Sequence, residues 1–131
     1  MRRLVVLAAL LAAAACESSN SVSPSVSIAG QYNLMTVNGA SLPYTFTTTN
    51  GASATLTSDM LTMNTDGSYS DIAQFQSSQG PYTINEVGTY STVNGSITFY
   101  DQTDGIQYNG SLSGSVLTEI NSGVTEVYQK Q

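Results

Sequence analysis

The sequence contains no histidine, no tryptophan and one cysteine, and only 9% of its 131 residues are charged. Without histidine, the commonest general base and transition-metal ligand of proteins is missing. Ordinary soluble domains are roughly a quarter charged, so the solvent face here must be built from Ser, Thr, Asn and Gln. Apolar residues are too frequent and too regularly spaced for a disordered polar tract. The composition therefore indicates one folded domain with a neutral polar surface.

Basic residues are few, three against nine carboxylates. Arg2 and Arg3 lie in a segment that we expect to be removed, which leaves Lys130 and a net charge of −8. Such a chain cannot neutralise phosphates, so nucleic acid and anionic membrane surfaces are poor partners.

Residues 1–15 have the pattern of a signal peptide. Met1-Arg2-Arg3 is followed by an apolar run from Leu4 to Ala15, which is shorter than the roughly 20 residues that span a bilayer. Ala13-Ala14-Ala15 satisfies an ordinary A-x-A cleavage site. The sequence therefore predicts export.

Cys16 follows this site directly, and Ala-Ala-Ala-Cys resembles the lipobox of bacterial lipoproteins, whose cysteine is diacylated and becomes the mature N-terminus. Two interpretations are open: a lipoprotein anchored through Cys16, or a secreted protein with an unpaired thiol. A free cysteine is a liability in an oxidising compartment, so we expect lipid attachment. The resemblance implies the cell envelope, and Glu17, where inner-membrane retention tends to use Asp, favours the outer membrane.

Residues 16–27 comprise this cysteine and a Ser-rich stretch with little to bury. We expect a flexible tether with a reach of roughly 18 Å, leaving residues 28–131 as the folded domain.

In residues 28–131, apolar side chains alternate with polar ones at the two-residue period of half-buried strands. Asn38-Gly39, Asn50-Gly51 and Asn94-Gly95 are typical hairpin turns between them. Tight hairpins exclude the long crossovers of parallel sheets. The sequence therefore predicts an all-β, up-and-down antiparallel meander, closed into a barrel of about eight or nine strands so that no edge is exposed.

Four details complete this prediction. We expect residues 42–46 to form the second strand of the wall and Ser58-Asp59 to lie near a β-bulge. We expect residues 76–81 to form the longest loop. Val116, Thr118 and Ile120 are expected to form one face of the eighth strand.

Aromatic and aliphatic residues of one parity are predicted to face the barrel interior: Tyr32, Leu34, Tyr44, Phe46, Tyr69, Phe75, Tyr82, Ile84, Tyr90, Ile97, Phe99, Tyr108, Leu112 and Tyr128. The positions between them, such as Asn33, Thr83 and Asn109, are polar, so we expect the outer wall to meet water. The tyrosine-rich interior has two interpretations. It lines a ligand cavity, or it fills a barrel that is only just wide enough for side chains.

Gly30-x-Tyr32-x-Leu34 resembles the G-x-W opening of lipocalins and the wider calycin group. In that group the aromatic residue plugs the closed end of the barrel, and a basic residue near the end of the last strand packs across it. Lys130 stands where that basic residue is expected, and Thr103-Asp104-Gly105 echoes the T-D-Y motif. The resemblance covers residues 28–130 and implies that a small apolar or amphipathic molecule binds at the open end.

Catalytic and metal motifs are weak. Asn64-x-Asp66-Gly67 with Asp71, and Asp101 with Asp104-Gly105, suggest calcium loops. Their spacing does not match one and Asp-Gly is first a hairpin turn, so we expect no metal or cofactor. Glu86 and Asp101 would suit a glycosidase pair only if folding placed them about 5–9.5 Å apart. We therefore expect no enzyme activity.

These observations favour a monomeric, lipid-anchored envelope protein with a lipocalin-like barrel that binds a small apolar or amphipathic molecule. The alternative is a structural or interaction module, an inhibitor or assembly factor, with a filled barrel. Such a module would present turn loops such as Gln79-Gly80-Pro81 to a protein partner.

Overall fold

The structure is a computed structural model that describes residues 27–131. The predicted signal peptide, Cys16 and all of the tether except Ser27 lie outside the described residues. The strands are β1 Gly30–Val37, β2 Ala40–Ser41, β3 Tyr44–Thr47, β4 Ser53–Met63, β5 Ser68–Ser77, β6 Gly80–Val93, β7 Ser96–Asp101, β8 Ile106–Ser113, β9 Val116–Asn121 and β10 Val124–Lys130.

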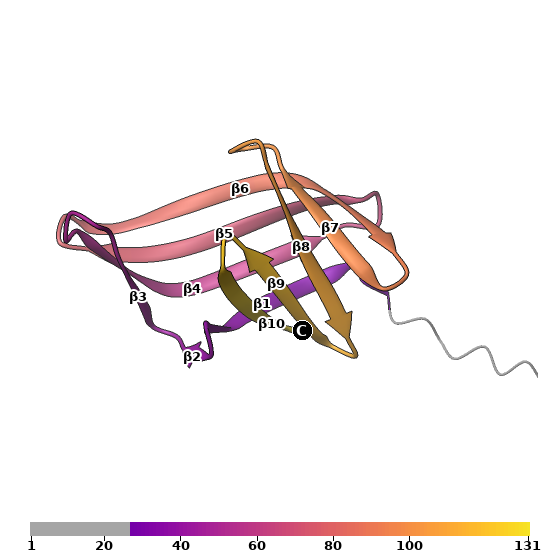
Figure 1. Cartoon of the computed structure of the whole chain (residues 1–131), viewed down its shortest axis with the longest axis horizontal. Helices are drawn as coiled ribbons and strands as arrows, with labels where there is room; N and C mark the ends of the chain where they lie inside the picture. Colours follow the sequence, from indigo (N-terminus) through magenta and orange to yellow (C-terminus); the bar gives the residue numbers. More distant parts are fainter. Residues whose placement is uncertain (1–26) are drawn as a thin grey trace, which may run out of the picture.

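The strands form a closed antiparallel barrel (Figure 1). From β4 to β10 each strand pairs with the next through a hairpin, and β1 closes the wall by pairing with both β10 and β4. Tyr32 of β1 lies opposite Lys130 on one side and Leu61 on the other. The barrel has eight strands, and β2 and β3 are additional. The predicted all-β, up-and-down barrel is confirmed.

The hairpin turns adopt the backbone conformation that their residues favour. Asn38 and Gly39 have φ angles of 50° and 79°, and Asn94 and Gly95 have 51° and 79°. These positive angles match the right-handed twist of the flanking strands, which is why Asn-Gly joins them in two residues. The predicted bulge is present, since the β4–β5 register shifts between Leu56 and Ser58.

The predictions for residues 42–46 and 76–81 are wrong. Residues 42–46 are not a strand of the wall, because β3 pairs with β4 over residues 53–56, beyond the stretch of β4 that pairs with β1. Residues 76–81 are not a long loop, because β5 and β6 stay paired as far as Ser77 and Gly80. Both strands therefore run on to the tip of the hairpin.

As a result, β4, β5 and β6 extend beyond the rest of the barrel and carry β3 along their side, at the left of Figure 1. These three strands have 11, 10 and 14 residues, whereas β7 has 6. Among residues 27–131, no strand lies opposite the inner face of this extension. It forms the open end of the barrel.

The opposite end is closed around Tyr32, which is fully buried. Its hydroxyl donates to the carbonyl of Ile28 at 2.5 Å, and the Nζ of Lys130 lies 5.6 Å from its ring centroid. Lys130 also donates to the carbonyl of Ser27. Gly30 makes room for this arrangement, because a Cβ there would lie 2.6 Å from the Lys130 side chain. The predicted aromatic plug and its basic cover are both present.

The predicted parity of β9 is wrong. Val116 and Ile120 are 37% and 55% exposed, while Leu117 and Glu119 are buried. The hairpin before β9 turns at Gly114 and Ser115, which places Leu117 directly opposite Leu112. Directly opposed residues share a face, so the inward Leu112 brings Leu117 and Glu119 inside with it.

Candidate ligand-binding site

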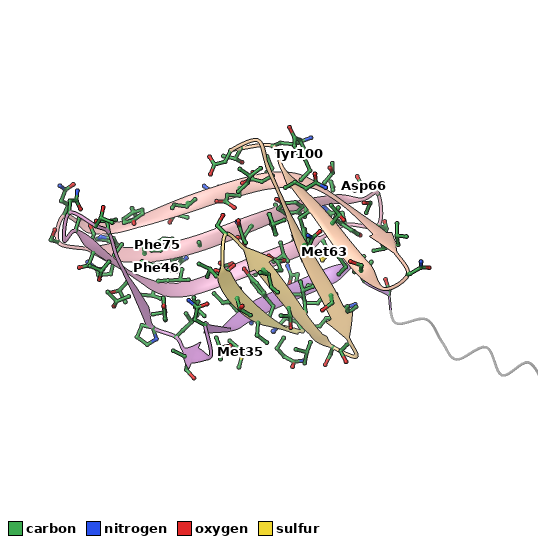
Figure 2. The ribbon with its side chains drawn as sticks, viewed as in Figure 1. Met35, Phe46, Met63, Asp66, Phe75 and Tyr100 are labelled. Atoms are coloured by element: carbon green, nitrogen blue, oxygen red, sulfur yellow. The ribbon has the colours of Figure 1, made fainter. Side chains whose placement is uncertain are left out.

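A pocket of about 580 Å³ lies at the open end, on the inner face of β3, β4, β5 and β6. Its apolar walls include Phe46 of β3, Phe75 of β5 and two residues of β6, Tyr82 and Ile84. Figure 2 shows Phe46 and Phe75 near each other at this end, with ring centroids 6.4 Å apart. The pocket is a concave apolar surface with a polar rim that includes Ser78 and Gln79.

The side chains of the pocket walls pack against one another but remain exposed to solvent. Phe75 and Tyr82 stack with ring centroids 5.2 Å apart and planes 8° apart. Tyr82 and Ile84 nevertheless remain 42% and 40% exposed. Apolar groups held in place and still open to water are the usual condition of a binding pocket.

The predicted lining residues divide between two regions. The closed half buries seven of them in a filled core: Tyr32, Leu34, Tyr69, Ile97, Phe99, Tyr108 and Tyr128. The pocket takes Phe46, Phe75, Tyr82 and Ile84. Tyr44 packs edge-on against Phe46, while Tyr90 and Leu112 are half-buried against the core. A filled core thus describes the closed half of the interior, and a ligand cavity describes the open half. Contact of these residues with a ligand stays a prediction.

An aromatic layer separates the core from the open end. Phe99 stacks on Tyr108 with centroids 5.0 Å apart and meets Tyr69 edge-on at 5.5 Å. The Tyr108 hydroxyl donates to that of Tyr69 at 3.3 Å. Gly88 leaves space for the Tyr69 side chain, because a Cβ at residue 88 would lie 2.6 Å from the Tyr69 ring. The three side chains of this layer, the aromatic floor, are buried.

Five carboxylates, the acidic layer, lie between the pocket and the aromatic floor: Asp59, Asp71, Glu86, Glu119 and Glu126. Their order along the strands places them there, because Asp71 lies between Tyr69 of the floor and Phe75 of the pocket, and Glu86 follows Ile84 on the inner face. The register sets Asp71 directly opposite Glu86, and Glu119 directly opposite Glu126. Like charges in such positions repel one another.

The acidic layer has few donors. Glu119 and Asp59 are 3% and 7% exposed. Among the described residues, Asp59 Oδ1, Asp71 Oδ1 and Glu119 Oε1 have no hydrogen-bond partner. Asp59 Oδ2 accepts from the Tyr128 hydroxyl at 3.3 Å. Lys130, the only Lys or Arg of residues 27–131, lies at the closed end against Tyr32.

The surroundings hold the pKa of every carboxyl in the layer above its ordinary value. Burial raises the pKa of Glu126 to about 7, and the charge of Asp71 adds to this. Burial, with Asp101 and Asp71, also raises the pKa of Glu86 to about 7. Burial also raises the pKa values of Asp59, Asp71 and Glu119. A proton on Asp59 lets it donate to Asp71, which neither carboxyl can do when both are ionised.

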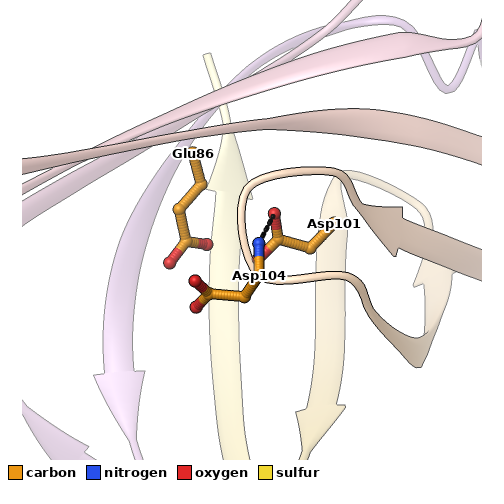
Figure 3. Close-up of side chains that lie close together, drawn as sticks. All are labelled: Glu86, Asp101 and Asp104. Carbon is orange, nitrogen blue, oxygen red and sulfur yellow. Dashed lines mark hydrogen bonds between the residues drawn. The ribbon is translucent and has the colours of Figure 1, made fainter.

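Glu86 also belongs to a second group, with Asp101 and Asp104, whose carboxylate oxygens lie within 4.8 Å of one another (Figure 3). Asp101 is 1% exposed, and its Oδ1 accepts from the backbone N–H groups of Thr103 and Asp104 at 2.7 and 3.3 Å. Asp101 thus holds the β7–β8 loop in shape. Carboxylate oxygens are the ligands that a hard divalent cation prefers. Asp101 Oδ1, however, already accepts two hydrogen bonds from the loop backbone.

The other suspected calcium loop does not assemble. Asp66 Oδ1 accepts from the backbone N–H and the hydroxyl of Ser68 at 2.9 and 2.6 Å, which is hairpin capping. Asp71 instead faces the barrel interior. Glu86 and Asp101, the carboxylate pair considered from the sequence, do lie close together. Asp101 accepts hydrogen bonds from the β7–β8 loop, and we assign no catalytic role to the pair.

The acidic layer was missed from the sequence although its signal was present. Asp71 has the parity of Tyr69 and Phe75, and Glu126 has that of Tyr128. Interpreting charged residues as surface residues hid both. Only Asp66 and Asp104, of the carboxylates in residues 27–131, are exposed.

Comparisons with known proteins give a likeness in fold. No protein-family model matches the chain, and no curated protein matches it. A crystal structure of a lipocalin-like protein from Bacteroides uniformis aligns with 79% of this chain and 97% of that one, at 19% identity and a TM-score of 0.49. This chain is similar to a lipocalin-like protein. So distant a likeness carries no argument about the ligand. The lipocalin-like architecture rests on the closed eight-strand meander itself.

Within residues 27–131 the lipocalin-like barrel has no helix long and apolar enough to cross a membrane.

Proposed function

We propose that this protein is a non-catalytic binding protein of the cell envelope, anchored in the outer membrane by a lipid on Cys16. Its lipocalin-like barrel takes up a small apolar or amphipathic molecule at the open end. The observation that carries this proposal is the pocket of about 580 Å³ bounded by Phe46, Phe75, Tyr82 and Ile84.

The size and lining of the pocket suit such a ligand. Small-molecule pockets commonly measure about 300–1,000 Å³ and are mostly apolar with a few polar groups at the rim. A ligand that covers Tyr82 and Ile84 removes their exposed apolar surface from water, which contributes about 25 cal/mol per Å². The stacked Phe75 and Tyr82 are already ordered, so binding loses little side-chain entropy.

The test is native mass spectrometry of the full-length protein from its own cells, followed by titration of the ligand-free protein with the molecule retained. We expect one ligand per chain and a change in tyrosine fluorescence. Tyr82→Ala is expected to weaken binding roughly tenfold, by loss of one well-packed wall. Tyr100→Ala is the matched control, because Tyr100 is 47% exposed on the outer face of β7 and far from Phe46 and Phe75 (Figure 2).

Equal loss in the two variants would show that the pocket is not the binding site. Purification without any small molecule, but with a stoichiometric protein partner, would favour an interaction module instead.

A further inference from the structure

The pocket and the acidic layer are continuous along the inner face of β5 and β6. Glu86 is two residues beyond Ile84 on the same face, a step of about 7 Å. On β5 only Ala73 lies between Phe75 and Asp71 on that face, and its side chain is small. A molecule seated against Phe75 and Ile84 therefore has its inner end beside Asp71 and Glu86.

The acidic layer offers hydrogen-bond acceptors that the described part of the chain leaves without donors. Glu119 Oε1 is in this position, and so are Asp59 Oδ1 and Asp71 Oδ1 when both of these carboxyls are ionised. Two of the side chains, Asp59 and Glu119, are more than nine-tenths buried. Leaving such groups unpaired costs free energy, which a donor with positive charge recovers.

We propose that the ligand of this pocket carries a primary ammonium group, which binds the acidic layer at Asp71 and Glu86 while its apolar part occupies the pocket. This inference rests on the proposed function, because one molecule fills both regions. A primary ammonium brings three N–H donors and one positive charge. The layer supplies acceptors and negative charge from two walls of the barrel, β4–β6 and β9–β10.

Other ligand charges fit less well. A carboxylate or phosphate would enter a layer of like charge, and Lys130 is held at the closed end. A metal ion needs oxygens that converge on one point. In residues 27–131 only Glu86, Asp101 and Asp104 form such a group of three, at the loop side of Glu86. The remaining carboxylates of the layer are spread along and across the barrel, which suits a donor on an extended ligand.

The experiment compares three ligands that share one alkyl chain, decylamine, decanol and decanoate, by isothermal titration of the full-length protein at neutral pH. We expect decylamine to bind roughly tenfold or more tightly than decanol, and decanoate to bind more weakly than either. In Glu86→Gln and Asp71→Asn the ratio of decylamine to decanol affinity is expected to fall about tenfold. Asp66→Asn, at the exposed hairpin of the opposite end (Figure 2), is expected to keep the wild-type ratio.

Each outcome decides between the two proposals. Equal binding of decylamine and decanol by the wild type overturns the ammonium site and leaves the proposed function standing. Failure of all three ligands to bind overturns both. Calcium chloride that binds without organic ligand, and loses affinity in Asp104→Asn, would assign Glu86 to a metal group and overturn the ammonium site.

Discussion

The acidic layer makes the folded protein sensitive to pH in an unusual direction. Glu126 has an ordinary pKa of 4.5 that rises to about 7 in the fold. As pH rises through 4.5, Glu126 of the unfolded chain loses its proton while that of the folded chain keeps it. The folded state then binds more protons, so its stability falls as pH rises, until Glu126 ionises near pH 7. The protein is expected to be most stable in mild acid and to lose stability between about pH 5 and pH 8.

The magnitude follows from the difference between the two pKa values. Each pKa unit corresponds to about 1.4 kcal/mol, so Glu126 alone accounts for about 3 kcal/mol. Glu86 has the same raised pKa but lies nearer to solvent, and screening reduces its share. Glu126 and Glu86 together contribute roughly 3–5 kcal/mol, which is a large part of the 5–15 kcal/mol that stabilises an ordinary domain. The Tm should fall by at least ~10 °C.

Burial is the main cause of the raised pKa of Glu126, and the charge of Asp71 adds to it. None of the ionisable groups near Glu126 in the described part of the chain is basic: Asp59 on β4, Asp71 on β5, Glu86 on β6, Glu119 on β9 and Tyr128 on β10. The carboxyl of Asp59 has a pKa raised to about 10, so it keeps its proton across this range while Asp59 of the unfolded chain is ionised, and it adds to the loss of stability.

The assay is urea unfolding, followed by far-UV circular dichroism at constant ionic strength in steps from about pH 5 to pH 8. Glu126→Gln is expected to lose the roughly 3 kcal/mol of pH dependence that Glu126 contributes and to be more stable than the wild type at the upper end. Asp66→Asn is the control, because the ordinary pKa of Asp66, 3.8, lies below this range and hydrogen bonds from Ser68 lower it further. Stability that stays constant or increases toward pH 8 would refute the account of the acidic layer.

Three further changes test other parts of the molecule. Gly88→Ala is expected to destabilise the protein by about 1–3 kcal/mol in thermal unfolding, since the new Cβ would lie 2.2 Å from a backbone oxygen and 2.6 Å from the Tyr69 ring; an unchanged Tm would contradict the described floor. Lys130→Met keeps the side-chain stem but removes the charge over Tyr32, and we expect a loss of about 0.5–1 kcal/mol. Cys16→Ser is expected to move the protein out of the membrane fraction, and its retention there would exclude the lipid anchor.

Local patterns were sufficient to predict the barrel. Alternation assigned the inner face of most strands, and Asn38-Gly39 and Asn94-Gly95 fixed two turns, because Asn and Gly adopt positive φ more readily than other residues. The Tyr32 plug and its Lys130 cover followed from a resemblance whose geometry the structure confirms. These features depend on neighbours in the sequence or on a shared motif.

Long-range pairing was not predictable in this way. Which strand closes the wall depends on β1 meeting β4, and nothing within residues 42–46 shows that β3 will instead border the extension. The pocket is a consequence of that choice. In β9, the two apolar residues Val116 and Ile120 share one face and Leu117 lies on the other, so the apolar pattern predicts the wrong inner face. The two-residue turn sets the register instead and turns Leu117 inward. Counting pairs back from that turn would have placed Glu119 inside.

The acidic layer also bears on what the ligand does to the barrel. Buried carboxylates without partners make the free protein less stable than apolar residues of the same shape would. A bound ammonium would remove that cost, and its effect would be larger where the carboxylates are ionised. A ligand stabilises a protein by RT ln(1 + [L]/Kd), so the increase in Tm on adding decylamine should be greater near pH 8 than near pH 5. Decanol has no charge to contribute, so its stabilisation should be the same at both. If the two ligands shifted Tm alike at both pH values, the acidic layer would have no part in binding, although the apolar pocket could still hold the alkyl chain.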